Sequence, residues 1–391
     1  MSSRKRSRSV TDNVKLGFQN QNRIRLNAIV TQSDTSSGFA ENMNRPLVSL
    51  LIVVRNGDRN IVGALDSFRQ QDYAPIEVIV VDGISEDQTR ELVEDYARKT
   101  QTLPIRLLDN PGRIQASGWN VGIRAAKGNY VLRLDAVHCR IAPDYVRRCL
   151  EKLLQLKSLD HRVAAVGGRR MSVAPTEDPW TQAIALAQLS RFGVGNATYR
   201  LSTSPTFTDT LGVALYDRNI LLESGLFNES LGRSEDNELH ARLRDQGFRL
   251  FFLPEAVAVY HPRTTLAGVA SQMFHNGWWV SATITRLRQF PFGIRHTAPF
   301  GFFVALLLAG ILDVSGFLAA RVLFVAMLGF YVVASLGAAF YTAPSSRFWR
   351  VAFVFWLMHT SYAGGTLAGF FAGKHDPSVG QVNAPGADQR L

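Results

Sequence analysis

The chain has 391 residues, of which 46% are hydrophobic and 19% are charged, and its formal net charge is +11. This length allows one large domain or two ordinary ones. Cys139 and Cys149 are its two cysteines, which excludes a disulfide framework and a cysteine-rich zinc site and predicts two structural thiols in a reducing environment.

Residues 1–45 form a polar, basic arm that holds eight Lys/Arg against three acids. The arm has too little apolar content to fold. It is not a signal peptide, because no apolar run follows the charges. A basic arm can bind nucleic acid or anionic lipid headgroups. An inert solvated tail fits equally well, and the apolar C-terminal region leads us to expect no nucleic-acid partner.

The next part of the chain alternates between apolar and amphipathic segments. Short, largely β-branched runs predict buried strands at 46–54, 76–83, 104–109 and 129–136. Helical spacing and end residues predict helices at 58–71, 85–99 and 113–128. Strands that alternate with helices predict a parallel α/β sheet.

Two acids stand where such a sheet binds its ligands. Asp82 and Asp135 end predicted strands, and ligands of open α/β sheets bind at the carboxyl ends of strands. "VRNGDRN" follows the first strand in place of G-x-G-x-x-G, and no Walker A sequence occurs, which argues against a dinucleotide site and a P-loop. Acids at strand ends that hold a divalent cation would instead serve a phosphorylated ligand.

The second half of this domain is less regular. We expect a strand at 162–170, a helix at 180–192 within irregular structure, and a strand with a short helix in 205–227. A further helix is expected to begin at Glu235 and Asp236. Acids in a first turn suit the helix dipole. A general base would use the same position at the edge of a cleft, so both interpretations stay open.

The C-terminal region is apolar. Residues 266–290 mix tryptophans with Arg286 and Arg288, which is typical of helices in a membrane interface. Residues 322–341 and 351–373 are long enough to cross a hydrocarbon core of about 30 Å. Residues 298–317 are a third span or a re-entrant segment, so we expect about three spans within 298–373, with two to four as the range. Basic residues before the first span place the front of the chain in the cytoplasm.

The chain resembles the family 2 glycosyltransferases of GT-A fold over roughly residues 45–290. "VSLLIVVRNGDRNIVGALDSFRQQDYAPIEVIVVDG" resembles the family's opening, "GWNVGIRAAKGNYVLRLDA" the stretch that leads to its metal-binding DxD motif, and "SEDNELHARLRDQGF" its ED motif. The order and separation of the three segments make the resemblance specific. It implies an α/β, Rossmann-like GT-A domain at 46–265, followed by interfacial helices at 266–297, transmembrane helices at 298–373 and a polar tail at 374–391.

The resemblance also implies roles for single residues. Asp82 would contact the uracil or ribose of a nucleotide sugar, and the family's second acid beside it is replaced by Gly83. Asp135 would hold a divalent metal, Mn or Mg. Asp236, with Glu235 beside it, would deprotonate the acceptor hydroxyl. Further residues expected on the nucleotide-sugar side are Asn56, Asp58 and Asn120.

"RLDAVH", "YHPRTTLAGVASQMFHNGWW" and the apolar C-terminus resemble the succinoglycan-assembly type of glycosyltransferase. The metal motif of that type tends to read Asp-Ala-His, whereas Asp135 and His138 are separated by two residues here. A shift of one residue on an extended segment turns a side chain to the other face. His138 is therefore a candidate ligand or an exposed loop residue, and His261 is a second candidate or a strand-end residue.

Four residues are expected on the acceptor or lipid side. Arg263 is a candidate for a phosphate or lipid headgroup, or a surface arginine. Asp209 is a candidate acceptor contact or a turn residue. Gln272 and Trp278 resemble part of the Q-x-x-R-W motif of processive synthases, but the spacing differs and the arginine is absent. With few spans for a polymer channel, this favours addition of a single sugar.

Together these features predict a membrane-anchored, inverting glycosyltransferase of exopolysaccharide or cell-envelope glycan synthesis. The resemblance favours UDP-glucose as donor and a polyprenyl-linked saccharide as acceptor, with membrane lipids and other assembly proteins as candidate partners. The expected location is the plasma or inner membrane. Two alternatives stay open: transfer onto polyprenyl phosphate itself, and a non-catalytic scaffold that binds nucleotide sugar.

Overall fold

The computed structural model describes residues 45–135, 138–288, 292–293, 296–343 and 347–371. The chain divides into Met1–Asn44 and Arg45–Leu391, and the described fold belongs to the second unit. The predicted basic arm, except Arg45, and the predicted polar tail lie outside the described residues.

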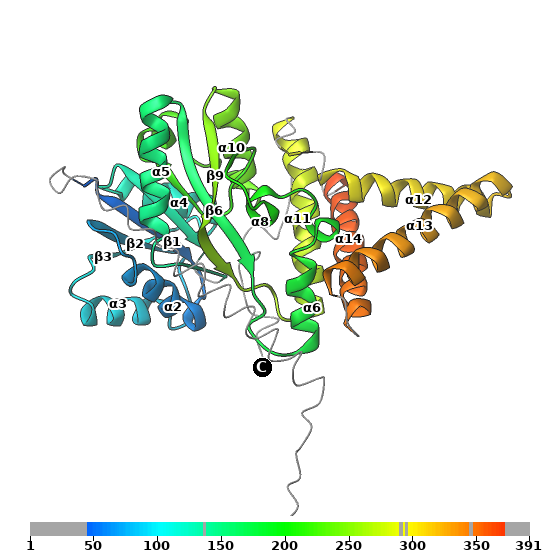
Figure 1. Cartoon of the computed structure of the whole chain (residues 1–391), viewed down its shortest axis with the longest axis horizontal. Coiled ribbons are helices and arrows are strands. Elements are labelled where there is room, and N and C mark those ends of the chain that lie inside the picture. Colours follow the sequence, from blue (N-terminus) through cyan, green and yellow to red (C-terminus); the bar gives the residue numbers. More distant parts are fainter. Residues whose placement is uncertain (1–44, 136–137, 289–291, 294–295, 344–346, 372–391) are drawn as a thin grey trace, which may run out of the picture. The chain divides into compact units, whose positions relative to one another are not determined.

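The first half of the domain is a parallel sheet covered on both faces. Its strands are β1 (Val48–Val54), β2 (Ile76–Asp82), β3 (Ile105–Asp109) and β4 (Tyr130–Asp135), in the order β3-β2-β1-β4. They alternate with α2 (Asp58–Arg69), α3 (Thr89–Lys99) and α4 (Gln115–Ala125), as predicted. Every residue of β1 is buried, because α2 and α3 cover one face of the sheet and α4 the other (Figure 1).

The second half makes the sheet mixed, which corrects the prediction of a parallel sheet. β8 (Ala214–Asp217) pairs antiparallel with β4 and with β6 (Val163–Ser172), and β6 pairs parallel with β9 (Arg249–Tyr260). Two short strands, β5 (Cys139–Ile141) and β7 (Thr206–Thr208), pair antiparallel with β9. Helix-strand alternation predicts the parallel part only, because strands beyond it enter after irregular connections that carry no crossover constraint.

Helices of the second half frame the carboxyl edge of the sheet. α5 (Tyr145–Leu159) lies on the face of α2, while α9 (Arg218–Glu223) and α10 (Glu235–Asp245) lie on the face of α4. The helix predicted at 180–192 is divided into α6 (Pro179–Ala187) and α7 (Arg191–Val194), and α8 (Thr198–Leu201) follows. Ser190 ends the predicted run because its side chain accepts from the backbone of Phe192 and begins α7.

The segment expected to hold interfacial helices forms one continuous helix, α11 (Leu266–Leu287), which packs along α14 (Phe348–Phe371) (Figure 1). Glycines allow the close approach: a Cβ on Gly365 would lie 1.9 Å from the carbonyl oxygen of Phe274, and one on Gly277 would lie 2.0 Å from that of Tyr362. Trp279 is buried in this part of the structure. Its ring therefore packs against protein, which accounts for an apolar residue that the sequence pattern had assigned to a membrane interface.

The three apolar segments all form helices, but the count of three spans is not confirmed. Among the described residues, one helix, α13 (Leu318–Thr342), is long and apolar enough to cross a membrane. α12 (Ala298–Val314) is shorter. α14 packs against α6, α11 and α13, with buried residues that include Val354 and Phe355. Other apolar residues of α14 are exposed, Trp356 and Phe371 among them, so one face of this helix is covered by protein and another is not.

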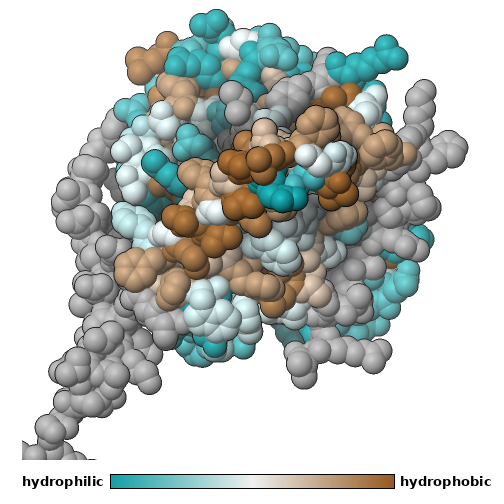
Figure 2. Space-filling view, turned by 90° about the vertical axis from the view of Figure 1, so that its right-hand side faces the viewer, coloured by the Kyte–Doolittle hydropathy of each residue, from teal (hydrophilic) through white to brown (hydrophobic). Residues whose placement is uncertain are grey.

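α12 and α13 form a hairpin that leaves much apolar surface uncovered. Its exposed side chains include Ile311, Phe317, Val325 and Phe330, the last being 72% exposed. Figure 2, which views the molecule from this side, shows a broad hydrophobic area that surrounds a small hydrophilic patch. An apolar area this wide marks a contact with lipid or with another protein.

Candidate active site

A cavity of about 760 Å³ opens at the carboxyl edge of the sheet and continues to the apolar helices. It begins at the ends of β1 and β4, passes the start of α10 and reaches α11 to α14. Of the sequence-predicted site residues, six line this cavity: Asp135, His138, Glu235, Asp236, Arg263 and Gln272. The others lie elsewhere: Asn56, Asp58, Asp82, Asn120, Asp209, His261 and Trp278.

Asp135 and His138 reach the cavity together, although the chain between them is one residue longer than in the motif that they resemble. His138 Nδ1 lies 3.0 Å from the carbonyl oxygen of His261, and the His261 backbone N–H donates to the carbonyl of His138 at 2.8 Å. This contact makes Nδ1 the protonated nitrogen and leaves Nε2 with a lone pair. Burial lowers the pKa of His138, so the ring is neutral at neutral pH, as metal ligation requires.

This pair fits a divalent cation as part of its ligand set. A metal-bound imidazole ordinarily donates its other N–H to a carbonyl or carboxylate, and His138 does so. Among the described residues, no group of three or more His, Cys, Asp or Glu side chains is placed to hold a metal. A cation here would therefore need phosphate and water oxygens, which Mg²⁺ usually retains.

The ring of His261 is not brought to the cavity. Its Nδ1 lies 3.3 Å from the carbonyl oxygen of Val173, and His261 does not line the cavity that holds Asp135 and His138. The structure therefore does not place the His261 side chain as the predicted metal ligand. Its backbone, rather than its side chain, fixes the orientation of His138.

Glu235 and Asp236 begin α10 and share one buried cation, Arg133 of β4. Arg133 lies 3.6 Å from a Glu235 carboxylate oxygen and 3.3 Å from one of Asp236. Its guanidinium group is held over the rings of Trp119 and Phe227. The Glu235 side chain is 7% exposed and that of Asp236 is 32% exposed. Asp236 is therefore the member of the pair that a ligand in the cavity can reach.

The pKa values of the two carboxyl groups are shifted in opposite directions. Burial, followed by the neighbouring Asp236, raises the pKa of Glu235 to about 7. Burial also opposes ionisation of Asp236, but Arg133 and His240 and the backbone N–H of Asn237 outweigh it, so the pKa of Asp236 is lowered. Asp236 is therefore ionised at neutral pH and can accept a proton, whereas Glu235 is partly protonated.

We expect Glu235→Gln to gain stability relative to the native protein as the pH rises. The pKa of Glu235 is raised in the folded state to about 7. Protonated Glu235 therefore stabilises the folded protein fully below an unfolded pKa of about 4.3, and this stabilisation is lost as the pH rises to 7. The melting temperature of the variant minus that of the native protein should be higher at pH 8 than at pH 5, by on the order of a few degrees.

Thermal unfolding of detergent-purified protein at the two pH values measures this difference. Glu91→Gln is the matched control, because Glu91 is exposed in the first turn of α3. Its difference from the native protein should stay constant between the two pH values. A constant difference for Glu235→Gln would contradict the raised pKa.

We expect Arg133→Met to destabilise the fold strongly. Removing one partner of a buried ion pair leaves uncompensated charge and costs about 3–5 kcal/mol, and here two neighbouring carboxylates lose their cation. The double variant Arg133→Met/Glu235→Gln should recover part of the loss, because one of those charges is then absent. Urea unfolding of the two variants, with exposed Arg98→Met as control, tests this. Equal stability of Arg133→Met and native protein would contradict the role of the pair.

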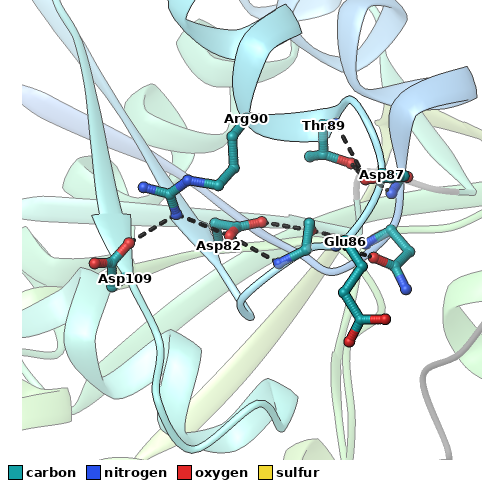
Figure 3. A network of polar contacts seen from close by, with 9 residues as sticks. Asp82, Glu86, Asp87, Thr89, Arg90 and Asp109 are labelled. Carbon is teal, nitrogen blue, oxygen red and sulfur yellow. Dashed lines mark hydrogen bonds and ion pairs between the residues drawn. The ribbon is translucent and has the colours of Figure 1, made fainter.

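Asp82 ends β2 as predicted, but its carboxylate is fully buried and points into a network of polar contacts (Figure 3). It accepts from Arg90 at 2.9 Å and from the hydroxyl of Ser85 at 2.5 Å. Arg90 also contacts Asp109 at 2.7 Å, so that Arg90 lies between the two carboxylates. In this structure Asp82 orders the rim of the cavity, and its neighbour Gly83 lines the cavity itself.

The same network explains why α3 begins at Thr89 rather than at the predicted residue 85. The Ser85 hydroxyl accepts from the backbone of Asn56, and the Asp87 carboxylate accepts from the backbone of Asp58 and from Thr89. These side chains bond to a neighbouring loop instead of continuing a helix. Asn56 and Asp58 thus fix the loop after β1 to the loop after β2, outside the cavity.

Three further predicted residues make structural contacts. The Asn120 amide bridges α4 to the loop before α10, because it donates to the carbonyl of Phe227 and accepts from that residue's N–H, each at 2.9 Å. Trp278 is 9% exposed and packs beside Trp279. Asp209 lies beside Thr208, which donates to it at 3.3 Å, and near Gly293. None of the three lines the cavity.

Several arginines and tyrosines line the cavity without having been singled out in the sequence. They are Arg55, Arg113, Arg133, Arg170, Arg191, Arg200, Arg233, Tyr199, Tyr260, Tyr331 and Tyr362. The one local sequence feature that could have indicated them is the pair of consecutive arginines in "GGRRMS" at the end of β6. Only the tertiary structure brings the rest to the same cavity.

Several known proteins of glycan synthesis are similar to this chain in sequence. The family model described as glycosyl transferase family 2 matches residues 49–224. A dolichyl N-acetyl-alpha-D-glucosaminyl phosphate 3-beta-D-2,3-diacetamido-2,3-dideoxy-beta-D-glucuronosyltransferase of Methanococcus voltae is 26% identical over 66% of this chain and 80% of its own. The succinoglycan biosynthesis protein ExoA of Rhizobium meliloti is 28% identical over 64% of this chain and 74% of its own.

Among solved structures, the mannosyltransferase PcManGT from Pyrobaculum calidifontis, in complex with GDP-Man and Mn²⁺, has a TM-score of 0.57 to this structure. It is 19% identical, and the match covers 92% of this chain and 96% of that one. At this identity the likeness concerns the fold, and it confirms the GT-A-like α/β domain expected from the sequence, with a mixed sheet in place of the expected parallel one.

Proposed function

We propose that this chain acts as a family 2 glycosyltransferase, whose family model matches residues 49–224, and that it transfers a single sugar, with inversion, from a UDP-sugar to a lipid-linked saccharide. The observation that carries the proposal is one cavity that holds Asp135 and His138 at one point and an ionised, accessible Asp236 at another. UDP-glucose is the donor that we propose to test first.

In the proposed reaction Asp236 acts as general base. Its carboxylate takes the proton of an acceptor hydroxyl, whose oxygen forms a bond to the anomeric carbon while the bond from that carbon to the UDP oxygen breaks. Arg133 positions Asp236 and keeps it ionised. A divalent cation, Mn²⁺ or Mg²⁺, would be held by Asp135 and His138 and, when bound, would neutralise the leaving diphosphate. A single displacement of this kind inverts the anomeric centre.

The lipid-linked acceptor is supported by two observations. The relative from Methanococcus voltae is named for transfer to a dolichyl N-acetyl-alpha-D-glucosaminyl phosphate, and the present cavity runs from Asp236 to apolar helices. We place the protein at the plasma or inner membrane through α12 to α14, with Arg286, Arg288 and Arg295 and the catalytic domain on the cytoplasmic side.

UDP release by detergent-purified protein tests the proposed function. The assay combines a panel of UDP-sugars, a membrane lipid extract, and Mn²⁺, Mg²⁺ or EDTA. We expect metal-dependent release with one UDP-sugar that requires the lipid extract. Release with polyprenyl phosphate as sole acceptor would instead favour transfer directly onto the lipid phosphate. No release with any sugar, from folded protein that also fails to bind UDP, would contradict the proposal.

A further inference from the structure

The cavity carries more positive charge than a nucleotide sugar requires. Eight arginines but three carboxylates line it, namely Asp135, Glu235 and Asp236. A nucleoside diphosphate sugar has one negative charge on each of two phosphates, and one divalent cation balances both. Glu235 and Asp236 are paired with Arg133, and Asp135 serves the proposed cation. Arginines are therefore left over after the donor is accounted for.

Four of these arginines form what we term the arginine cluster: Arg170, Arg200, Arg233 and Arg263. Within the described residues, no carboxylate lies within ion-pair distance of any of them. The Nε atoms of Arg170 and Arg233 are buried without a hydrogen-bond partner in the same residues. Burial, followed by the nearby charge of Arg263, lowers the pKa of Arg233. Like charges gathered in this way are unfavourable unless an anion joins them.

The guanidinium groups of the cluster are held in place by neutral partners. Arg170 lies 4.3 Å from the ring centroid of Tyr260 and also stacks on Tyr199. Arg200 lies over both rings as well and donates to the side chain of Gln188 at 3.1 Å. Arg233 donates to the side chain of Asn276, on α11, at 2.9 Å. Fixed guanidinium donors are the usual means of binding phosphate groups.

Beyond the cluster the lining of the cavity becomes largely aromatic, with His359 beside Tyr331 as a polar neighbour. Its walls there include Phe192 of α7, Phe302 and Phe303 of α12, and Tyr331 of α13. The Tyr331 ring lies 5.3 Å from that of Phe302 and 5.8 Å from that of Phe192. These residues sit at the base of the hairpin whose outer surface is apolar and exposed (Figure 2). A positively charged, anion-binding site thus opens into a largely apolar passage.

We propose that the arginine cluster binds the diphosphate of an isoprenoid diphosphate lipid, whose chain leaves between Phe192, Phe302, Phe303 and Tyr331. This inference rests on the proposed function, because the lipid is the carrier of the acceptor saccharide. Three members of the cluster, Arg170, Arg233 and Arg263, lie near enough to Asp135 or His138 to affect them electrostatically, so the competition with UDP described below decides whether the lipid and the donor occupy separate places. A second phosphate-bearing ligand next to Asp236 explains both the excess of arginines and the direction of the cavity.

Equilibrium binding of labelled farnesyl diphosphate to the full-length protein in detergent tests the proposal, in the presence of saturating UDP and Mn²⁺. We expect binding to persist under these conditions. Farnesol and inorganic diphosphate should each compete at least about ten-fold less well, because each lacks one half of the ligand. Arg200→Gln and Arg233→Gln should each weaken binding by about ten-fold or more, since a charge-assisted hydrogen bond to the phosphate is lost.

Two control variants sharpen the test. Phe302→Asn should weaken binding of farnesyl diphosphate but not of inorganic diphosphate, and Arg98→Gln, on the exposed face of α3, should change neither. Thermal unfolding checks that each variant is folded. Displacement of farnesyl diphosphate by UDP would overturn the proposal, because the ligand would then occupy the donor site. Unchanged binding by both arginine variants, or equal affinity for inorganic diphosphate, would overturn it as well.

The proposed function can fail separately. If no UDP-sugar is turned over while farnesyl diphosphate still binds in an arginine-dependent way, the lipid site stands and the assigned reaction is wrong. If UDP is released with a lipid acceptor but the arginine variants bind farnesyl diphosphate as the native protein does, the reaction stands and the lipid site is wrong.

Discussion

Asp236→Asn is expected to lower the rate of sugar transfer by about 10²–10⁴-fold, the usual contribution of a general base. Asparagine keeps the shape of the side chain and its contact with Asn237 but cannot accept the proton of an acceptor hydroxyl. The native side chain is ionised because Arg133 and His240 lower its pKa against the effect of burial. Turnover should therefore fall while donor binding persists.

The measurement is UDP release in the presence of lipid acceptor, together with the affinity for UDP. Asp245→Asn is the matched control, since Asp245 is exposed at the other end of α10. That variant should retain native turnover. A rate for Asp236→Asn within ten-fold of the native rate would rule out Asp236 as the base. Glu235 would then be the next candidate, with a rate that rises with pH through its pKa of about 7.

Asp135→Asn is expected to abolish the dependence of UDP binding on Mn²⁺ and to lower transfer by about 100-fold or more. A neutral amide is a poor ligand beside a carboxylate for a hard divalent cation. The cation contributes several kcal/mol of charge stabilisation in such reactions, and each 1.36 kcal/mol is about ten-fold in rate. EDTA should reduce the native protein to the level of the variant.

Titration of UDP affinity with Mn²⁺ separates the loss of a metal ligand from a general loss of activity. The control is Asp109→Asn, because Asp109 also ends a strand of the parallel half but is bound to Arg90. It should retain the response to Mn²⁺. His138→Ala should weaken the response without abolishing it, since Asp135 is still present. A native response to Mn²⁺ in Asp135→Asn would show that the cation, if used, is held elsewhere.

Local patterns in the sequence determined the first half of the fold. The strands β1 to β4 and the helices between them fall within a few residues of their predicted ends. A run such as "VSLLIVV", six of whose seven residues are apolar, is typical of a strand that is covered on both faces. The positions of Asp135 and Asp236 follow in the same way, because a strand end and a helix start are local features.

Which side chain faces the cavity was decided by the tertiary structure. Asp82 and Asp135 both end parallel strands, yet the first is enclosed by Arg90 and Ser85 while the second lines the cavity. His138 and His261 are joined by one backbone hydrogen bond and by a contact from the His138 ring to the His261 carbonyl, and of the two rings that of His138 lines the cavity. Such differences depend on neighbours distant in the chain, which no local pattern contains.

The arginine cluster also depends on the tertiary structure rather than on local sequence. Its members come from β6, from α8 and from the segments before α10 and after β9. Each is an ordinary arginine in its local sequence, because periodicity reports the partners of a residue only within its own helix or strand. The antiparallel entry of β8 between β4 and β6 brings these elements to one edge. The sequence alone therefore determined the strands and helices of the parallel half, whereas the order of the strands decided which charges meet.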